Sequence, residues 1–186
     1  MPDLARLPLS RADIVLWIRW VIVTAAVIGL CAGLGPIGYF IGPVLLGVGQ
    51  ALVLRFSQGP ALAWGLATVI GGYFGLIALT ASIIFINPWV GVFIGAAILG
   101  VAQAIAMQGT LRHWVWWPLV SILALMIGVG WFVPQGFNAM VYGSQRPAWV
   151  WALMGGGCGA LGGALKGGMW VLLQRRRPTP SLGSED

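Results

Sequence analysis

The stretch from Pro60 to Met107, PALAWGLATVIGGYFGLIALTASIIFINPWVGVFIGAAILGVAQAIAM, decides the fold. It contains no Asp, Glu, Lys, Arg or His, and its clearest turn signal is Asn87-Pro88. Because a helix rises about 1.5 Å per residue, about 20 apolar residues cross a hydrocarbon core of about 30 Å. The stretch therefore predicts two membrane crossings joined by a tight turn.

The rest of the chain has the same character. Of its 186 residues, 59% are hydrophobic and 8% are charged, whereas soluble domains carry roughly 25% charged residues. Six segments reach the crossing length: Ile14–Leu34, Ile37–Phe56, Pro60–Phe85, Trp89–Met107, Trp114–Val133 and Ala148–Leu173. We expect an all-α integral membrane bundle of six transmembrane helices (14–174), between a cytoplasmic N-terminal segment (1–13) and a disordered cytoplasmic tail (175–186).

The basic residues predict the orientation. When the connections are assigned alternately to the two sides, one side receives nine of the ten Lys and Arg residues and the other receives only Arg146. By the positive-inside rule the first side is cytoplasmic. We therefore expect both termini in the cytoplasm and the protein in the bacterial inner membrane. The eleven tryptophans lie near predicted span ends, a placement typical of aromatic belts at the membrane interfaces.

A shift of 53 residues aligns part of the chain with itself without a gap. The matches include Gly47-Val48-x-Gln50-Ala51 with Gly100-Val101-x-Gln103-Ala104, Trp64 with Trp117, and Thr68 with Ser121. A third copy begins at Gly163-x-x-Lys166, and Trp20-x-x-x-Thr24 is a partial earlier one. The pattern predicts three parallel helical-hairpin repeats about a pseudo-threefold axis; chance recurrence in an apolar sequence is the alternative.

The pattern G-x-x-Q, then an arginine, then W-x-x-x-[ST], resembles a group of uncharacterised multi-spanning bacterial membrane proteins with repeated two-helix hairpins. The resemblance covers most of the membrane region and implies no activity and no functional residue. The chain departs from the pattern by carrying Lys166 in the third copy and Gln108 where Arg55 would align.

Three polar residues occupy equivalent positions in the three copies. Gln50, Gln103 and Lys166 each lie in the cytoplasmic half of a predicted helix and follow a glycine three residues earlier. Under threefold symmetry they converge as a polar core, and a lysine inside a membrane is by default a candidate functional site. The alternative is that Lys166 extends to the cytoplasmic interface while the glutamines cross-link helices.

The last predicted helix carries glycines at intervals of four. Gly155, Gly159, Gly163 and Gly167 form a stripe of small residues, a glycine zipper, against which another helix can pack closely. We expect a packing role for this stripe. A glycine-lined conduit or a hinge is the alternative.

Groups that carry enzyme chemistry are scarce in this sequence. No Asp or Glu lies in a predicted span, and neither Cys31 nor Cys158 has a partner at metal-ligand spacing. The lone His113 could supply at most one axial ligand to a haem or pigment, and we expect it to lie at the membrane interface. We therefore predict no catalytic residue, no metal and no cofactor. The placement of the cations argues against nucleic acid as a partner.

These features favour a non-catalytic role. The first hypothesis is an accessory, assembly or scaffolding component of a membrane protein complex, with the lipid bilayer and other membrane subunits as partners. The alternative is a small transporter or channel for a neutral or anionic solute or lipid, with Gln50, Gln103 and Lys166 as its polar constriction. Binding of a pigment or a specific lipid is a third hypothesis.

Overall fold

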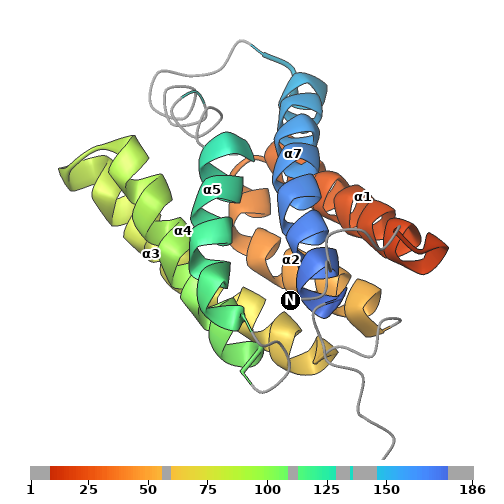
Figure 1. Cartoon of the computed structure of the whole chain (residues 1–186). Coiled ribbons are helices and arrows are strands. Elements are labelled where there is room, and N and C mark those ends of the chain that lie inside the picture. The colour runs from red at the N-terminus through yellow and green to blue at the C-terminus, as the bar shows by residue number, and fades with distance from the viewer. Residues whose placement is uncertain (1–8, 56–59, 109–112, 129–134, 136–145, 176–186) are drawn as a thin grey trace, which may run out of the picture.

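The computed structural model describes residues 9–55, 60–108, 113–128, 135 and 146–175. These contain six α-helices: α1 (Arg11–Gly33), α2 (Pro36–Arg55), α3 (Ala61–Phe85), α4 (Pro88–Ala106), α5 (Trp117–Gly128) and α7 (Ala148–Arg175) (Figure 1). A 3-10 turn, η2 (Trp114–Trp116), precedes α5. The described residues contain no strand, and the all-α prediction is confirmed. The predicted tail lies outside the described residues except for Arg175.

Five helices, α1 to α4 and α7, are long and apolar enough to cross a membrane. Each begins and ends within three residues of its predicted boundaries. The fifth predicted span differs, because α5 has 12 residues and covers only about 18 Å at about 1.5 Å per residue. Residues 129–133, the predicted end of that span, lie outside the described part of the chain. The chain is a multi-pass membrane protein with five long candidate spans and a shorter sixth apolar helix.

The start of α1 is set by a capping box that the sequence analysis did not use. The Ser10 Oγ accepts a hydrogen bond from the Asp13 backbone N–H at 3.2 Å, and the Ser10 N–H donates to Asp13 Oδ2 at 3.1 Å. These bonds satisfy N–H groups that a helix start otherwise leaves unpaired. The helix therefore begins at Arg11, three residues before the predicted apolar segment.

The tight turn predicted at Asn87-Pro88 is confirmed, a second lies at Gly35-Pro36, and both have local causes. Gly35 has a φ of 58°, in the left-handed region that glycine adopts without a steric penalty, and Pro36 then begins α2. The Asn87 side chain accepts a hydrogen bond from the Trp89 N–H at 2.8 Å, and Pro88 is the first residue of α4. Each turn brings successive helices side by side.

The six helices form a closed ring. The main helix contacts link α1 to α2, α2 to α3, α3 to α4, α4 to α5, α5 to α7 and α7 back to α1 (Figure 1). Neighbours in the chain are thus neighbours in space, and among these helix pairs only α1 and α7 lie at opposite ends of the sequence. Such a ring has an interior, lined by one face of every helix, and an exterior.

Helix α7 closes the ring by packing along α1 through its glycines. A Cβ atom added to any glycine of the predicted stripe would lie within 3.1 Å of an α1 atom. At Gly159 that atom is the Thr24 carbonyl oxygen, 2.8 Å away. Even the smallest side chain would crowd α1 at these positions, so glycine lets the two backbones approach closely, as small residues do between membrane helices.

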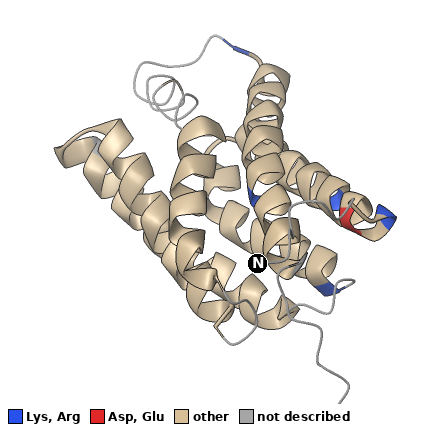
Figure 2. Cartoon of the chain, in the orientation of Figure 1, with Lys and Arg blue, Asp and Glu red and all other residues tan. Residues whose placement is uncertain are grey.

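The exterior of the ring is apolar. Large hydrophobic side chains such as Ile22, Leu62, Phe74 and Leu153 are exposed, as expected of helices that face lipid. Charged residues in the described part of the chain lie mostly near helix ends (Figure 2). Lys166 is different, because it lies well inside α7 and is only 6% exposed.

Candidate functional site

Seven polar side chains are buried in the described part of the chain; Ser82 lies near the end of α3, and the other six come one from each α-helix. These six are Thr24 of α1, Gln50 of α2, Thr68 of α3, Gln103 of α4, Ser121 of α5 and Lys166 of α7. None of the six is more than 6% exposed. We call this set the polar layer. Burying so many polar groups inside a membrane protein is costly unless each finds a hydrogen-bond partner.

Two of these partners are tryptophans placed in the same way. Trp64 Nε1 donates to Gln50 Oε1 at 3.0 Å, and Trp117 Nε1 donates to Gln103 Oε1 at 3.0 Å. In both pairs the tryptophan follows the glutamine by 14 residues and lies on the next helix of the ring. The indole N–H therefore fixes the amide orientation twice in the same manner.

Lys166 and Trp20 do not form a hydrogen bond of this kind. Lys166 takes the glutamine position on α7, and the next helix of the ring, α1, carries Trp20. A lysine has no acceptor to offer, and Trp20 Nε1 is buried without a hydrogen-bond partner. The indole N–H of Trp20 therefore lacks the amide acceptor that Gln50 and Gln103 provide to Trp64 and Trp117.

Gln103 is the centre of the hydrogen-bond network. Its Oε1 accepts from Lys166 Nζ at 3.0 Å in addition to Trp117, and its Nε2 donates to Thr68 Oγ1 at 2.9 Å. The network joins α7, α5 and α3 to Gln103 of α4, and so ties four helices together. Because the side-chain oxygen of Gln103 already receives two donors, it has no capacity left for a third.

Several donors of the interior remain without partners. Lys166 has three N–H donors, and its only hydrogen bond to a described residue is the one to Gln103. The Thr24 and Ser121 hydroxyls and the indole nitrogens of Trp20 and Trp170 are buried with no hydrogen-bond partner in the described part of the chain. The interior therefore has unpaired donors, with no carboxylate in the layer to accept from them.

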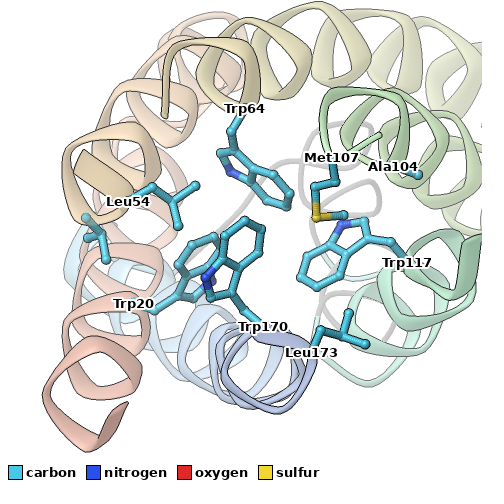
Figure 3. Close-up of a cluster of buried hydrophobic side chains, with 9 residues drawn as sticks. Trp20, Leu54, Trp64, Ala104, Met107, Trp117, Trp170 and Leu173 are labelled. Atoms are coloured by element: carbon cyan, nitrogen blue, oxygen red, sulfur yellow. The ribbon is translucent and has the colours of Figure 1, made fainter. Parts of the chain in front are cut away.

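On one side of the polar layer, four tryptophans fill the ring. Trp20, Trp64, Trp117 and Trp170 are 0% exposed and point into the interior together with Leu54, Met107 and Leu173 (Figure 3). Their ring centroids lie 5.2 to 6.0 Å apart, mostly in edge-to-face geometry, which is favourable for aromatic pairs. Each lies one helical turn from the polar residue of its own helix. We call this set the tryptophan layer.

On the other side of the polar layer, the interior contains a cavity of about 230 Å³. Its walls come from α1 to α5 and are almost entirely apolar, with Val27, Leu46, Leu99 and Leu125 among them. Thr68 belongs both to the cavity wall and to the polar layer. The hydrogen-bond network of Gln103 and Lys166 thus begins at the edge of the cavity.

The three polar residues that the sequence singled out are all buried, but they do not all touch. Lys166 is bonded directly to Gln103, whereas Gln50 is held by Trp64 and is joined to the others only through the tryptophan layer. The Lys166 amine is directed into the bundle, so the alternative in which it extends to the interface does not describe this structure.

The aromatic-belt prediction is wrong for four of the eleven tryptophans. The members of the tryptophan layer face the interior because the ring turns that face of α1, α3, α5 and α7 inward. Trp17, Trp89, Trp116 and Trp149 are exposed, as membrane-interface tryptophans are. The repeat could have revealed the difference, since Trp20, Trp64 and Trp117 precede the repeated Thr or Ser by one turn.

Thr24, Thr68 and Ser121 were used in the sequence analysis as markers of the repeat and not as site residues. The structure adds them to the site, since they complete the polar layer. The remaining reactive side chains lie apart from one another: Cys31 lines the cavity, Cys158 is buried on α7 and His113 precedes η2. The described residues contain no group of three His, Cys, Asp or Glu side chains that could hold a metal ion.

Comparison of the chain with protein-family models, with curated proteins and with solved structures finds no match. The long apolar helices define the class, a multi-pass α-helical membrane protein.

Proposed function

We propose that this protein is a non-catalytic membrane protein that binds a small solute or lipid inside its bundle, as the binding step of a small transporter. The observation that carries the proposal is the adjacency of an apolar cavity and a polar layer that contains Lys166 and unpaired donors. A site with mostly apolar walls and a few converging polar groups is typical of small-molecule binding.

The non-catalytic part of the proposal is supported by the residue types in the site. The polar layer offers hydroxyl, amide and amine groups, and none of its six members is a histidine, cysteine or carboxylate that could activate a nucleophile or relay a proton. Such a layer is suited to holding a ligand by hydrogen bonds.

A scaffolding or assembly role in a membrane protein complex, the first hypothesis from the sequence, is the second candidate. The tryptophan layer favours it, because four packed indoles leave no continuous path through the ring in this conformation. Purification in mild detergent at native abundance separates the candidates. A stable complex with other chains supports scaffolding, and a protein that purifies alone supports solute binding.

We also propose that the bundle is built from three parallel hairpins about a pseudo-threefold axis. The duplicated bond between tryptophan and glutamine supports this, as do the glycines Gly47, Gly100 and Gly163 that precede the polar residues. An added Cβ on each would lie within 3.3 Å of a backbone atom of the residue that follows Trp64, Trp117 or Trp20. An experimental structure superposed on itself by hairpins tests this symmetry.

The proposed setting is the bacterial inner membrane with both termini in the cytoplasm, supported by the partition of Lys and Arg in the sequence. This orientation puts the tryptophan layer in the cytoplasmic half and the cavity in the outer half. Reporter fusions at both termini test it. A periplasmic signal from either terminus would contradict it.

The binding site itself is tested by photolabelling in nanodiscs. The probe is octanol that carries a diazirine on its chain, and the labelled residues are identified by mass spectrometry. We expect labels on cavity-lining residues of α1 to α5. Gly42→Leu should reduce them, because an added Cβ at Gly42 has only ordinary contacts with Cys31 and a longer side chain extends into the cavity.

The matched control for that substitution is Gly157→Leu, since Gly157 has no atom within 4 Å of an added Cβ. Labels confined to the exterior of the ring would overturn the proposal. Transport is then measured as protein-dependent movement of the same probe between liposome leaflets.

A further inference from the structure

We infer that the interior site takes an anionic amphiphile: a carboxylate head held in the polar layer at Lys166, with its hydrocarbon chain in the cavity. This inference deepens the proposed function and rests on it. It selects the charge and shape of the ligand, which the proposed function leaves open.

The hydrogen-bond donors and acceptors of the interior favour a ligand that accepts hydrogen bonds. The acceptors in the layer that the structure pairs are Gln50 Oε1, which accepts from Trp64, Gln103 Oε1, which accepts from Trp117 and Lys166, and Thr68 Oγ1, which accepts from Gln103. The groups that remain include donors that cannot accept, two N–H of a protonated Lys166 and the indole N–H of Trp20 and of Trp170, beside the Thr24 and Ser121 hydroxyls, which can donate or accept. Buried polar groups are nearly always paired in folded proteins, so the missing partner is an acceptor.

The charge of a protonated Lys166 also favours an anionic ligand. A protonated Lys166 has no acidic side chain among its described hydrogen-bond partners, and an isolated cation in a low-dielectric interior is strongly disfavoured. A carboxylate accepts several hydrogen bonds and carries one negative charge, so it matches one ammonium and the neighbouring N–H donors. A neutral alcohol or a cationic amine does not provide this match.

The size and the apolar wall of the cavity favour a ligand with a hydrocarbon chain. The cavity of about 230 Å³ has an apolar wall, and an engineered apolar cavity of about 150 Å³ is already large enough to bind benzene. Its one link to the amine is Thr68, whose Oγ1 accepts from Gln103 and whose own proton has no acceptor among the described residues. A head placed near Thr68 therefore leaves the chain in the apolar space.

The tryptophan layer fixes the direction of the ligand. Its side chains fill the ring (Figure 3), and none of the four tryptophans is among the residues that line the cavity, so a chain cannot extend that way in this conformation. The head thus lies toward the tryptophans and the chain toward the opposite end of the bundle.

The test varies the head of one photoreactive chain. Diazirine-labelled octanoate, octanol and octylamine are compared in nanodiscs that contain the native protein, and apparent affinity is measured from the labelling of cavity residues. We expect octanoate to label most strongly. Lys166→Met should weaken octanoate binding about 10- to 100-fold, as expected for loss of a hydrogen bond to a charged group, and should leave octanol unchanged.

Two further variants serve as a control and as a second test in that experiment. Arg55→Met removes a cation at the end of α2, away from the polar layer, and should not change octanoate binding. Ser121→Ala deletes a buried hydroxyl that has no partner, so it should not disturb folding. It should weaken octanoate binding a few-fold, which keeps the inference testable if Lys166→Met fails to fold.

The outcomes separate the inference from the proposed function. If octanol labels the cavity as strongly as octanoate, and Ser121→Ala and Lys166→Met have no effect, the anionic ligand is overturned while the interior site stands. Preferential labelling by octylamine has the same consequence. If no probe labels the cavity, both the inference and the proposed function are overturned.

Discussion

The two halves of the ring interior share helices α1 to α5 and yet differ in how they are filled. In one half, inward-facing tryptophans pack against one another beneath the polar layer. In the other half, the inward-facing positions include Gly38, Gly42, Gly72 and Gly75, and a cavity remains. An apolar composition alone therefore does not decide whether a bundle interior is solid or hollow.

The difference has a packing cause. Indole side chains can meet at the centre of the bundle only where the helices leave room between them. The four indoles of the tryptophan layer occupy that room. In the hollow half the glycines instead let neighbouring helices approach each other: an added Cβ at Gly75 would lie 2.8 Å from the Gly95 carbonyl oxygen. Close contact between adjacent helices is retained there while the centre stays empty.

The largest effect is expected where the ring closes. Gly159→Leu places a branched side chain where a Cβ alone would lie 2.8 Å from the Thr24 carbonyl oxygen, so it must push α7 away from α1. We expect a loss of about 1–3 kcal/mol or more, typical of overpacking, seen as a clear drop in thermal stability in detergent. Gly157→Leu is the control and should have little effect, since its side chain meets open space. Equal stability of the two variants would show that α7 is not tightly held.

An intermediate effect is expected in the filled half. Trp64→Phe keeps an aromatic ring but leaves Gln50 Oε1 without its donor, and we expect it to cost about 1–3 kcal/mol, the usual penalty for an unsatisfied buried polar group. Trp170→Phe is the matched control, because Trp170 Nε1 has no partner in the described part of the chain. The comparison of their melting temperatures in detergent isolates the hydrogen bond from the ring. A melting temperature for Trp64→Phe no lower than that of Trp170→Phe would mean that the bond does not stabilise the bundle.

The smallest effect is expected in the hollow half. Gly42→Leu adds apolar volume to the cavity without a close contact, the nearest atom to an added Cβ being Cys31 Sγ at 3.5 Å. We expect a change in thermal stability of less than about 1 kcal/mol, in either direction, because new contacts and glycine replacement favour the fold while residual crowding opposes it. A destabilisation as large as that of Gly159→Leu would show that the cavity is smaller or less deformable than its walls indicate.

Much of the fold was readable from the sequence for a simple reason. Crossing a bilayer requires long apolar helices. In this chain Gly35-Pro36 and Asn87-Pro88 lie between such helices, and their backbone preferences end one helix and begin the next. The length of the fifth helix is the exception, since its apolar segment continues past Gly128 into residues that the structure does not describe.

The sequence predicted only some residues of the candidate site. Gln50, Gln103 and Lys166 stand out because polar groups are rare in membrane spans, but the sequence gives no sign that Lys166 bonds to Gln103 and Gln50 does not. The tryptophans were misread as interfacial because position near a helix end does not say which way a side chain faces.

The sequence by itself determined that the chain is an apolar, multi-pass helical protein, because hydrophobic length and turn residues act locally along the chain. Only the tertiary structure decided which faces turn inward. Closure of the ring by α7 against α1 brings together residues that are distant in sequence. The polar layer, the tryptophan layer and the cavity exist only because all six helices share one interior.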